Sequence, residues 1–284
     1  MNVASSSASK NSGPKGSGPI GVFDSGVGGL SVLREIRSQL PYEHLIFLGD
    51  QIHVPYGPRP LQQVRDFSET ITRFLLDQGA KLIVVACNTA SAAALYHLRE
   101  AFPAVPFVGM EPAVKPAAEQ TQSGAVGVLA TPATFQGELY ASVVERFANG
   151  VTVLQDTCPG LVGQIEKGDL ASPATRKILE NALAPMLEKD IDRVVMGCTH
   201  YPFVIPLIQE IVGPQVQVID PAPAVARQAG RVLERRGLSN TANAPGQVHY
   251  LTSGDSAKLS NLLQLLLGVE AKVDKIIWGE GSLK

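Results

Sequence analysis

Short apolar runs alternate with longer amphipathic stretches along the chain, and this alternation restricts the fold more than any other feature. The runs predict strands at 20–24, 45–49, 82–86, 105–109, 126–130, 151–155, 193–197, 216–219 and 248–251. The stretches between them predict helices at 29–39, 61–78, 90–101, 135–148, 174–189, 203–212, 223–236 and 255–267. Strands that are apolar on both faces, each followed by a helix, are typical of parallel sheets covered by helices on both sides. The chain is therefore predicted to be an α/β protein.

Landmarks from the first part of the chain recur later in the same order, which indicates an internal repeat. Segments 21–26, 47–50 and 109–112 match 127–131, 153–156 and 218–221, and the phrase at Cys87 matches the phrase at Cys198. The spacing runs from 106 (156 − 50) to 111 (198 − 87) residues. Matching segments that keep the same order and a nearly constant spacing predict a duplicated structural unit. We expect two α/β domains related by a pseudo-twofold axis, with the active site in the cleft between them.

Composition excludes several classes of protein. The net charge of −2 over 284 residues gives no basic field, which argues against nucleic acid as a partner. Three widely spaced cysteines do not form a disulfide framework and suit a reducing cytoplasm. The most apolar helix candidate, 262–267, is far shorter than the roughly 20 residues of a membrane span. Residues 1–19, rich in Ser, Gly and Lys, predict a disordered tail rather than an export signal.

Cys87 and Cys198 each end an apolar run and precede a predicted helix. The carboxyl ends of strands face the crevice where open α/β sheets bind ligands. In a pseudo-twofold pair, the two thiols would lie on opposite sides of one cleft. One thiolate could then remove a proton from one face of a carbon while the other thiol delivers a proton to the opposite face. Since a free thiol has a pKa of roughly 8.5, the predicted helix N-termini after both cysteines would favour ionisation.

Polar neighbours support this hypothesis and distinguish the two thiols. Asp24, at the end of the first strand, could assist Cys87 and bind a substrate ammonium group. His200, beside the other strand-end cysteine, could assist Cys198. Asn88 with Thr89, and Thr199 on the other side, could cap helices or bind a carboxylate.

Together these residues carry a resemblance to a known family. Segments 22–30, 55–57, 87–90 and 197–202, and Cys158-Pro159 with Glu166, follow the order of its motifs. The chain resembles the glutamate racemases, cofactor-independent enzymes of the aspartate/glutamate racemase superfamily, from about residue 20 to 268. The resemblance implies direct 1,1-proton transfer between L- and D-glutamate without cofactor or metal, in the cytoplasm, with D-glutamate feeding peptidoglycan. Family members commonly form homodimers, and in some lineages a peptidoglycan precursor activates them.

The resemblance also implies a domain division and a set of site residues. Residues 20–112 with 223–284 would form the first domain, and 113–222 the second. Cys87 and Cys198 would be the acid/bases, assisted by Asp24, His200 and Glu166. The implied substrate contacts are Asp24, Ser25, Tyr56, Gly57, Asn88, Thr89, Thr199 and His200, with Thr131 and Thr134 as additions. Near the last two, the chain has Ala133 and Gly137 where the family usually has Gly and Ser.

Other interpretations remain open. Aspartate and hydantoin racemases and a single-thiol decarboxylase are related alternatives, and the presence of both cysteines argues against the last. A zinc protein could use Cys87, Cys158, Cys198 and His200, although these lack the close paired spacing of zinc sites. A non-catalytic amino-acid sensor would bind glutamate without exchanging its α-hydrogen. Segment 26–29 lacks the remaining residues of a dinucleotide or phosphate loop, so we interpret it as a tight turn that admits a small ligand to backbone N–H groups.

Overall fold

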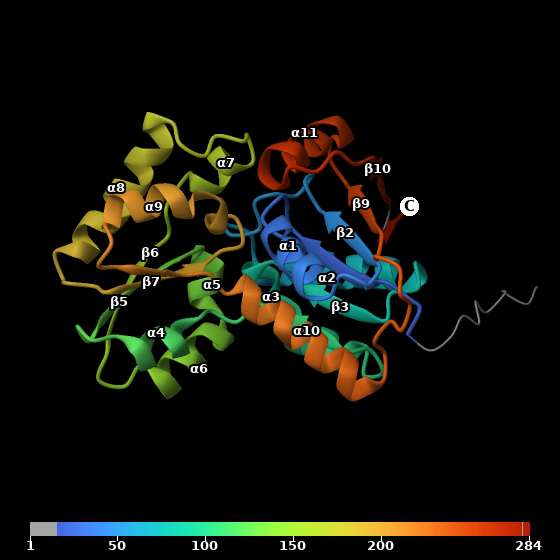
Figure 1. The fold of residues 1–284 in the computed structure, drawn as a ribbon, viewed down its shortest axis with the longest axis horizontal. Coiled ribbons are helices and arrows are strands. Elements are labelled where there is room, and N and C mark those ends of the chain that lie inside the picture. The colour runs from blue at the N-terminus through green and yellow to red at the C-terminus, as the bar shows by residue number, and fades with distance from the viewer. Residues whose placement is uncertain (1–15, 280) are drawn as a thin grey trace, which may run out of the picture.

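The computed structural model describes residues 16–279 and 281–284. Most of the tail predicted at 1–19 therefore lies outside the described residues. Within them, two parallel sheets stand side by side, each covered by helices (Figure 1). No helix in this part of the chain combines the length and the apolar character that crossing a membrane requires.

The first sheet has the strand order β10-β9-β2-β1-β3-β4. Its strands are β1 (Ile20–Asp24), β2 (Leu45–Gly49), β3 (Leu82–Val85), β4 (Phe107–Gly109), β9 (Val248–Thr252) and β10 (Val273–Lys275). Its helices are α1 (Leu30–Gln39), α2 (Leu61–Asp77), α3 (Asn88–Ala101), α10 (Ala222–Arg236) and α11 (Ser256–Leu267). Successive side chains of β1 point to opposite faces of the sheet. Val22 belongs to the hydrophobic core that includes residues of α1 and α10, and Phe23 belongs to the core that includes residues of α2 and α3.

The second sheet has the order β6-β5-β7-β8. Its strands are β5 (Ala125–Ala130), β6 (Thr152–Asp156), β7 (Arg193–Gly197) and β8 (Gln217–Ile219). Its helices are α4 (Val114–Gln120), α5 (Pro132–Gln136), α6 (Glu138–Phe147), α7 (Leu161–Ile165), α8 (Pro173–Leu187) and α9 (Ile205–Val212), preceded by a 3₁₀ turn η1 (Tyr201–Val204). In Figure 1, α8 and α9 lie above this sheet and α4 and α6 below it. The α/β class with parallel sheets is thus confirmed.

The strand order repeats between the sheets, as the landmarks predicted. β2-β1-β3-β4 in the first corresponds to β6-β5-β7-β8 in the second. Gly21 pairs with Ile83 and Gly127 with Val194, so the cysteine phrases that follow β3 and β7 are equivalent. The outer strands correspond less closely, because Gly21 pairs with Ile46 but Gly127 pairs with Leu154. Leu154 is therefore equivalent to Ile46 and not to Leu48, and the sequence match there is two residues out of register.

Several elements differ from the prediction. The helix predicted at 135–148 is divided at Gly137, whose backbone is extended and where an added Cβ would lie 2.7 Å from Cβ of Ala92. That contact between α3 and the start of α6 leaves no room for a side chain. The short helices α4 and α7 and the strands β10, β11 (Trp278–Gly279) and β12 (Ser282–Leu283) were not predicted. Elements this short carry too few residues for a hydrophobic period to show.

Candidate active site

Both strand-end thiols line a single small cavity. Cys87 follows β3 of the first sheet and Cys198 follows β7 of the second. The cavity has a volume of about 10 Å³, comparable to the space that one water needs. Its lining residues are Ser25, Pro55, Tyr56, Cys87, Asn88, Thr89, Thr131, Val162, Cys198, Thr199 and His200. The pairing of the two thiols across one enclosed space is as the repeat predicted.

Cys87 begins α3 as its N-cap. Its Sγ accepts a hydrogen bond from the N–H of Ala90 at 3.5 Å and lies 3.8 Å from Oγ of Ser25. The Ser25 hydroxyl is in turn 3.5 Å from Oδ1 of Asp24. Burial raises the pKa of the Cys87 thiol, and the nearby Asp24 carboxylate raises it further. Cys87 is therefore held as a neutral thiol, despite the helix N-terminus behind it.

Cys198 has a different environment, which corrects one prediction. The chain after it enters η1 rather than an α-helix, so the predicted helix N-terminus is absent at this thiol. Instead, Sγ of Cys198 lies 3.8 Å from Nδ1 of His200, and Nε2 of the same ring is 2.7 Å from Oε1 of Glu166. Burial alone would lower the pKa of His200, but its bonds and charge interactions with Cys198 and Glu166 raise that pKa well above 6.5. The ring is therefore held as an imidazolium.

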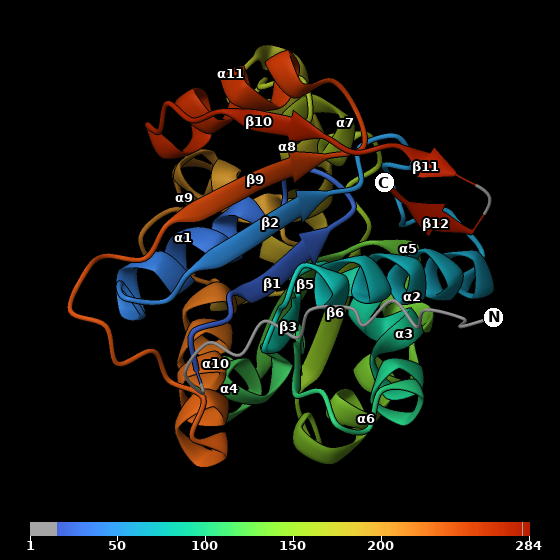
Figure 2. The same ribbon diagram turned by 90° about the vertical axis from the view of Figure 1, so that its right-hand side faces the viewer.

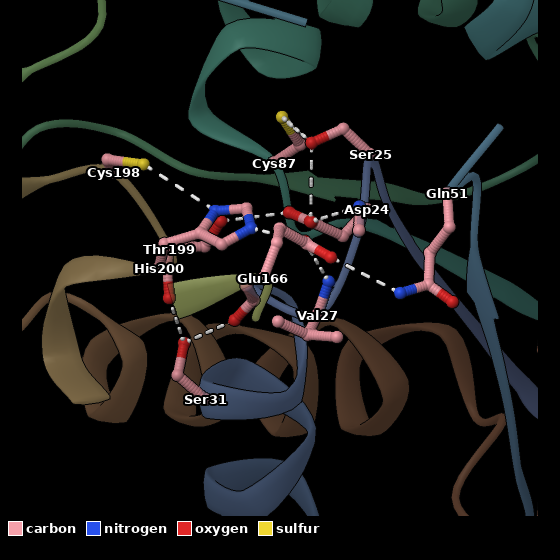
Figure 3. Close-up of polar contacts among 12 residues, drawn as sticks. Asp24, Ser25, Val27, Ser31, Gln51, Cys87, Glu166, Cys198, Thr199 and His200 are labelled. Carbon is pink, nitrogen blue, oxygen red and sulfur yellow. Dashed lines mark hydrogen bonds and ion pairs between the residues drawn. The ribbon is translucent and has the colours of Figure 1, made fainter. Parts of the chain in front are cut away.

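Glu166 is the anion that stabilises this imidazolium. Burial favours the neutral acid, but hydrogen bonds from His200, from the N–H of Val27 at 2.7 Å and from the Gln51 amide at 3.2 Å outweigh it and lower the pKa of Glu166. Figure 3 shows the carboxylate between these three donors. Glu166 follows α7, which precedes β7, whereas Val27 follows β1, so this carboxylate joins the two sheets.

Asp24 also links the two sheets, but here the carboxylate belongs to the first sheet and the donor to the second. It is fully buried, and its Oδ1 accepts from the N–H of Gly26 while its Oδ2 accepts from the Thr199 hydroxyl, both at 2.8 Å. Burial raises the pKa of Asp24, an effect that the positive His200 partly offsets. Asp24 thus lies behind the cavity, near Cys87 through Ser25, and holds a residue that flanks Cys198 (Figure 3).

Side chains of the other sheet approach the glycine turn at 26–29 closely. An added Cβ on Gly26 would lie 1.9 Å from Oε1 of Glu166, and one on Gly28 would lie 2.5 Å from Nδ1 of His200. The N–H of Val27 is likewise bound to Glu166. The close approach inferred from the glycines is therefore present, and the group that approaches is the Glu166–His200 pair.

Asn88 is a buried side chain with unused hydrogen-bonding capacity. Among the described residues, neither its Oδ1 nor its Nδ2 finds a partner, although both are buried and the residue lines the cavity. Buried polar atoms without partners are rare and call for a functional explanation. Beside it, the hydroxyl of Thr89 is 2.8 Å from that of Thr131, which is 3.0 Å from that of Thr134. Of this hydroxyl chain, Thr89 and Thr131 line the cavity.

Tyr56 lines the cavity, and its hydroxyl donates to Oδ2 of Asp50 at 2.6 Å. The contact between Tyr56 and substrate, which the resemblance implies, stays a prediction. Gly57 lies behind the wall, where an added Cβ would meet Thr131 at 2.9 Å.

Sequence reasoning missed the lining residues Pro55 and Val162 and the supporting carboxylate Asp50. Asp50 could have been found, because it directly follows a strand in one of the repeated landmarks. Val162 carries no such signal. The described residues contain no group of three or more His, Cys, Asp or Glu side chains arranged to hold a metal ion, so the four residues of the zinc alternative are not brought together as ligands.

Comparison with known proteins places these observations in context. A family model described as Asp/Glu/hydantoin racemase matches residues 20–229. The glutamate racemase of Pseudomonas aeruginosa PAO1 is 50% identical over 261 residues, covering 92% of this chain and 98% of the relative. A glutamate racemase isoform of Bacillus anthracis has a TM-score of 0.83 at 32% identity, covering 94% and 99% of the two chains. Escherichia coli glutamate racemase, solved with L-glutamate and the activator UDP-MurNAc-Ala, has a TM-score of 0.81 at 31% identity, covering 92% and 99%.

Proposed function

The chain belongs to the Asp/Glu/hydantoin racemase family, and we propose that it interconverts L- and D-glutamate by moving a proton on and off the α-carbon without a cofactor. The observation that carries this proposal is the cavity that Cys87 and Cys198 line together from two sheets. D-glutamate made in the cytoplasm would supply peptidoglycan synthesis. The division into 20–112 with 223–284 and 113–222 belongs to the same proposal.

The charges around the thiols assign their starting roles. Cys198 is assigned as the first base because the His200 imidazolium lies 3.8 Å from its Sγ and can donate to it, whereas burial and Asp24 keep Cys87 protonated. The Cys198 thiolate removes the α-proton of the enantiomer that presents it, and Cys87 gives its proton to the opposite face. The product enantiomer leaves with the proton positions exchanged, and the reverse reaction starts from that state.

Substrate binding uses the polar groups that line the cavity. The unpartnered amide of Asn88 and the hydroxyls of Ser25, Thr89 and Thr199 are suited to a carboxylate and an ammonium group. Thr131, linked to Thr134, extends this set, and Asp24 supplies the negative charge nearest the ammonium group. A cavity of about 10 Å³ is too small for glutamate, so we expect the two sheets to separate when substrate enters.

The decisive experiment is incubation of L-glutamate in D₂O with the purified protein and no added cofactor. Racemisation with deuterium incorporated at the α-carbon supports the proposal. Binding without exchange would instead identify an amino-acid sensor. Faster turnover of L-aspartate than of L-glutamate would favour an aspartate racemase.

An activator and a homodimer complete the proposal. A cavity of about 720 Å³ lies where α3, α4, α6 and α10 meet, and four cations on its lining outnumber the carboxylates of Glu111 and Asp220. These cations are Arg99, Lys115, Arg146 and Arg227. Anionic groups such as the pyrophosphate of UDP-MurNAc-Ala suit this lining. Helix α3 connects the two cavities. Its first turn carries Asn88, which lines the small cavity, and its last turn carries Arg99, which lines the large one.

The test of this part is the racemisation rate with and without UDP-MurNAc-Ala. Activation that is lost in Arg227→Ala, with the basal rate kept, supports the assigned cavity, and an unchanged activation contradicts it. Light scattering on the purified chain tests the dimer.

A further inference from the structure

Asp50 is a fully buried carboxylate that stands behind the cavity wall. Its Oδ2 accepts from the Tyr56 hydroxyl at 2.6 Å and lies 2.9 Å from Nδ1 of His53. Its Oδ1 accepts from the Ser253 hydroxyl and from Nε1 of Trp278, both at 2.7 Å. A buried carboxylate is tolerated only when hydrogen-bond donors surround it. These five side chains therefore form one interdependent cluster.

The cluster joins segments that are far apart in the sequence. Asp50 follows β2, Ser253 follows β9, and Trp278 begins β11, which is 228 residues beyond Asp50. Figure 2 shows the β11–β12 hairpin just beyond the arrowheads of β9 and β10. The C-terminal hairpin is thereby tied to the loop that carries Pro55 and Tyr56 into the cavity.

Aromatic packing reinforces the same link. The Trp278 ring meets His53 at 4.9 Å and Phe67 at 5.5 Å between centroids, in edge-on geometry. His53 stacks on Phe67 at 4.1 Å, and Tyr56 lies 5.6 Å from Phe67. A displacement of the indole would therefore disturb Phe67, which packs against the Tyr56 ring, and His53, which stacks on Phe67.

We propose that Asp50 and Trp278 are positioning residues, which fix the Tyr56 ring in the cavity wall so that the C-terminal hairpin controls how tightly substrate is held. This inference rests on the proposed function. Neither Asp50 nor Trp278 lines the cavity, so they act on substrate only through Tyr56. Substrate affinity should respond to the cluster, while proton transfer at the thiols should not.

The hydrogen-bonding inventory of the cluster makes the Asp50→Asn variant informative. Serine and tyrosine hydroxyls can donate or accept, whereas the indole N–H of Trp278 can only donate. An asparagine must therefore turn its oxygen toward Trp278 and its NH₂ toward Tyr56. The Tyr56 hydroxyl then becomes an acceptor, and its proton is released from the cluster.

The experiment is a double-mutant cycle on the full-length protein. KM and kcat for D-glutamate and its dissociation constant by calorimetry are measured for wild type, Trp278→Phe, Tyr56→Phe and the double variant, with Asp50→Asn alongside. Ile277→Ala, on the same hairpin with an exposed side chain, is the matched control. We expect Trp278→Phe and Asp50→Asn to weaken binding about fivefold, the size of one lost hydrogen bond, with kcat nearly unchanged. Trp278→Phe should have almost no further effect in the Tyr56→Phe background.

The fluorescence of Trp278 gives a second readout, because it is the only tryptophan in the chain. D-glutamate should change its emission in wild type and much less in Tyr56→Phe. Equal weakening of binding by Trp278→Phe in both backgrounds would overturn the coupling, since it would show that the two residues act independently. Normal glutamate binding without racemisation would refute the proposed function and leave the coupling intact.

Discussion

Replacement of Glu166 by glutamine tests the charge arrangement at Cys198 most directly. Oε1 of Glu166 accepts from His200 and Val27, and Oε2 accepts from Gln51. Thr252 donates to Oε1 of Gln51, which fixes the orientation of the Gln51 amide. A glutamine at 166 retains one acceptor oxygen, so its NH₂ must face at least one buried donor.

The size of the effect follows from these contacts. An unsatisfied buried group costs about 1–3 kcal/mol, and removal of one charge from a buried pair costs about 3–5 kcal/mol. His200 can relieve part of that cost by losing its proton. We therefore expect Glu166→Gln to lower the free energy of unfolding by about 3 kcal/mol in the mildly acidic range. We also expect kcat/KM to fall about 10- to 100-fold, because the imidazole beside Cys198 would no longer be held as a cation.

The destabilisation should depend on pH in a defined direction. The pKa of His200 is raised in the folded state, so its contribution is fully present below pH 6.5 and is lost as pH rises through the folded-state value. The pKa of Glu166 is lowered, so its contribution is present above pH 4.5 and is lost as pH falls. The difference between wild type and Glu166→Gln should therefore be largest between pH 4.5 and 6.5, declining above by at most about 1.4 kcal/mol per pH unit.

Urea unfolding followed by circular dichroism at several pH values measures this difference. Glu69→Gln is the matched control, because Oε2 of Glu69 lies 2.6 Å from Nε2 of His97 while both side chains are about one-third exposed. An exposed pair is worth about 0–1 kcal/mol. kcat/KM should fall equally in both directions, since the enantiomers have equal free energy. A difference between wild type and Glu166→Gln that is constant across pH, or no greater than that of Glu69→Gln, would refute the reasoning.

Four further substitutions test the rest of the site. Cys87→Ser and Cys198→Ser should each abolish racemisation but still exchange the α-hydrogen of one enantiomer in D₂O, by NMR and chiral chromatography; racemisation by either contradicts two-base transfer. Asn88→Ala should raise KM about tenfold and keep or raise stability by up to about 1 kcal/mol, because it removes unpartnered buried atoms; a large fall in melting temperature would contradict this. Gly28→Ala should abolish activity, because its Cβ meets an imidazole at 2.5 Å, whereas Gly163→Ala, with nothing within 4 Å, should stay active.

The parts predicted from sequence are those that local physics dictates. β1 and β7 have the predicted bounds because their residues are apolar on both faces and end at a glycine or a polar residue. The equivalence of Cys87 and Cys198 could be predicted because each follows a strand and the two positions are separated by about the period of the repeat. Their pKa environments did not follow, because the chain after Cys198 forms a 3₁₀ turn that the apolar pattern at 203–212 does not distinguish from a helix.

Contacts between distant segments lay beyond prediction. The Asp50–Trp278 hydrogen bond spans 228 residues and involves a two-residue strand. Neither a hydrophobic period nor a helix-capping pattern in the sequence indicates such a contact. The register of the outer strands could not be predicted either. A shift of two residues leaves each side chain on the same face of the sheet, so the hydrophobic pattern of β6 fits either pairing. Packing of the whole sheet decides between them.

The repeat gives the site its symmetry, and the links between the sheets give the two thiols their unequal charges. Asp24, the last residue of β1, accepts from Thr199 on the side of the second sheet, and Glu166, which precedes β7, accepts from Val27 on the side of the first. Any opening that admits glutamate by separating the sheets must strain or break both bonds. Asp24 and Glu166 therefore have their complete sets of hydrogen-bond donors only while the two sheets are together. Under the proposed mechanism, closure of the sheets around bound glutamate would shield a thiolate from water, so that it would react with the α-proton of the substrate and not with solvent.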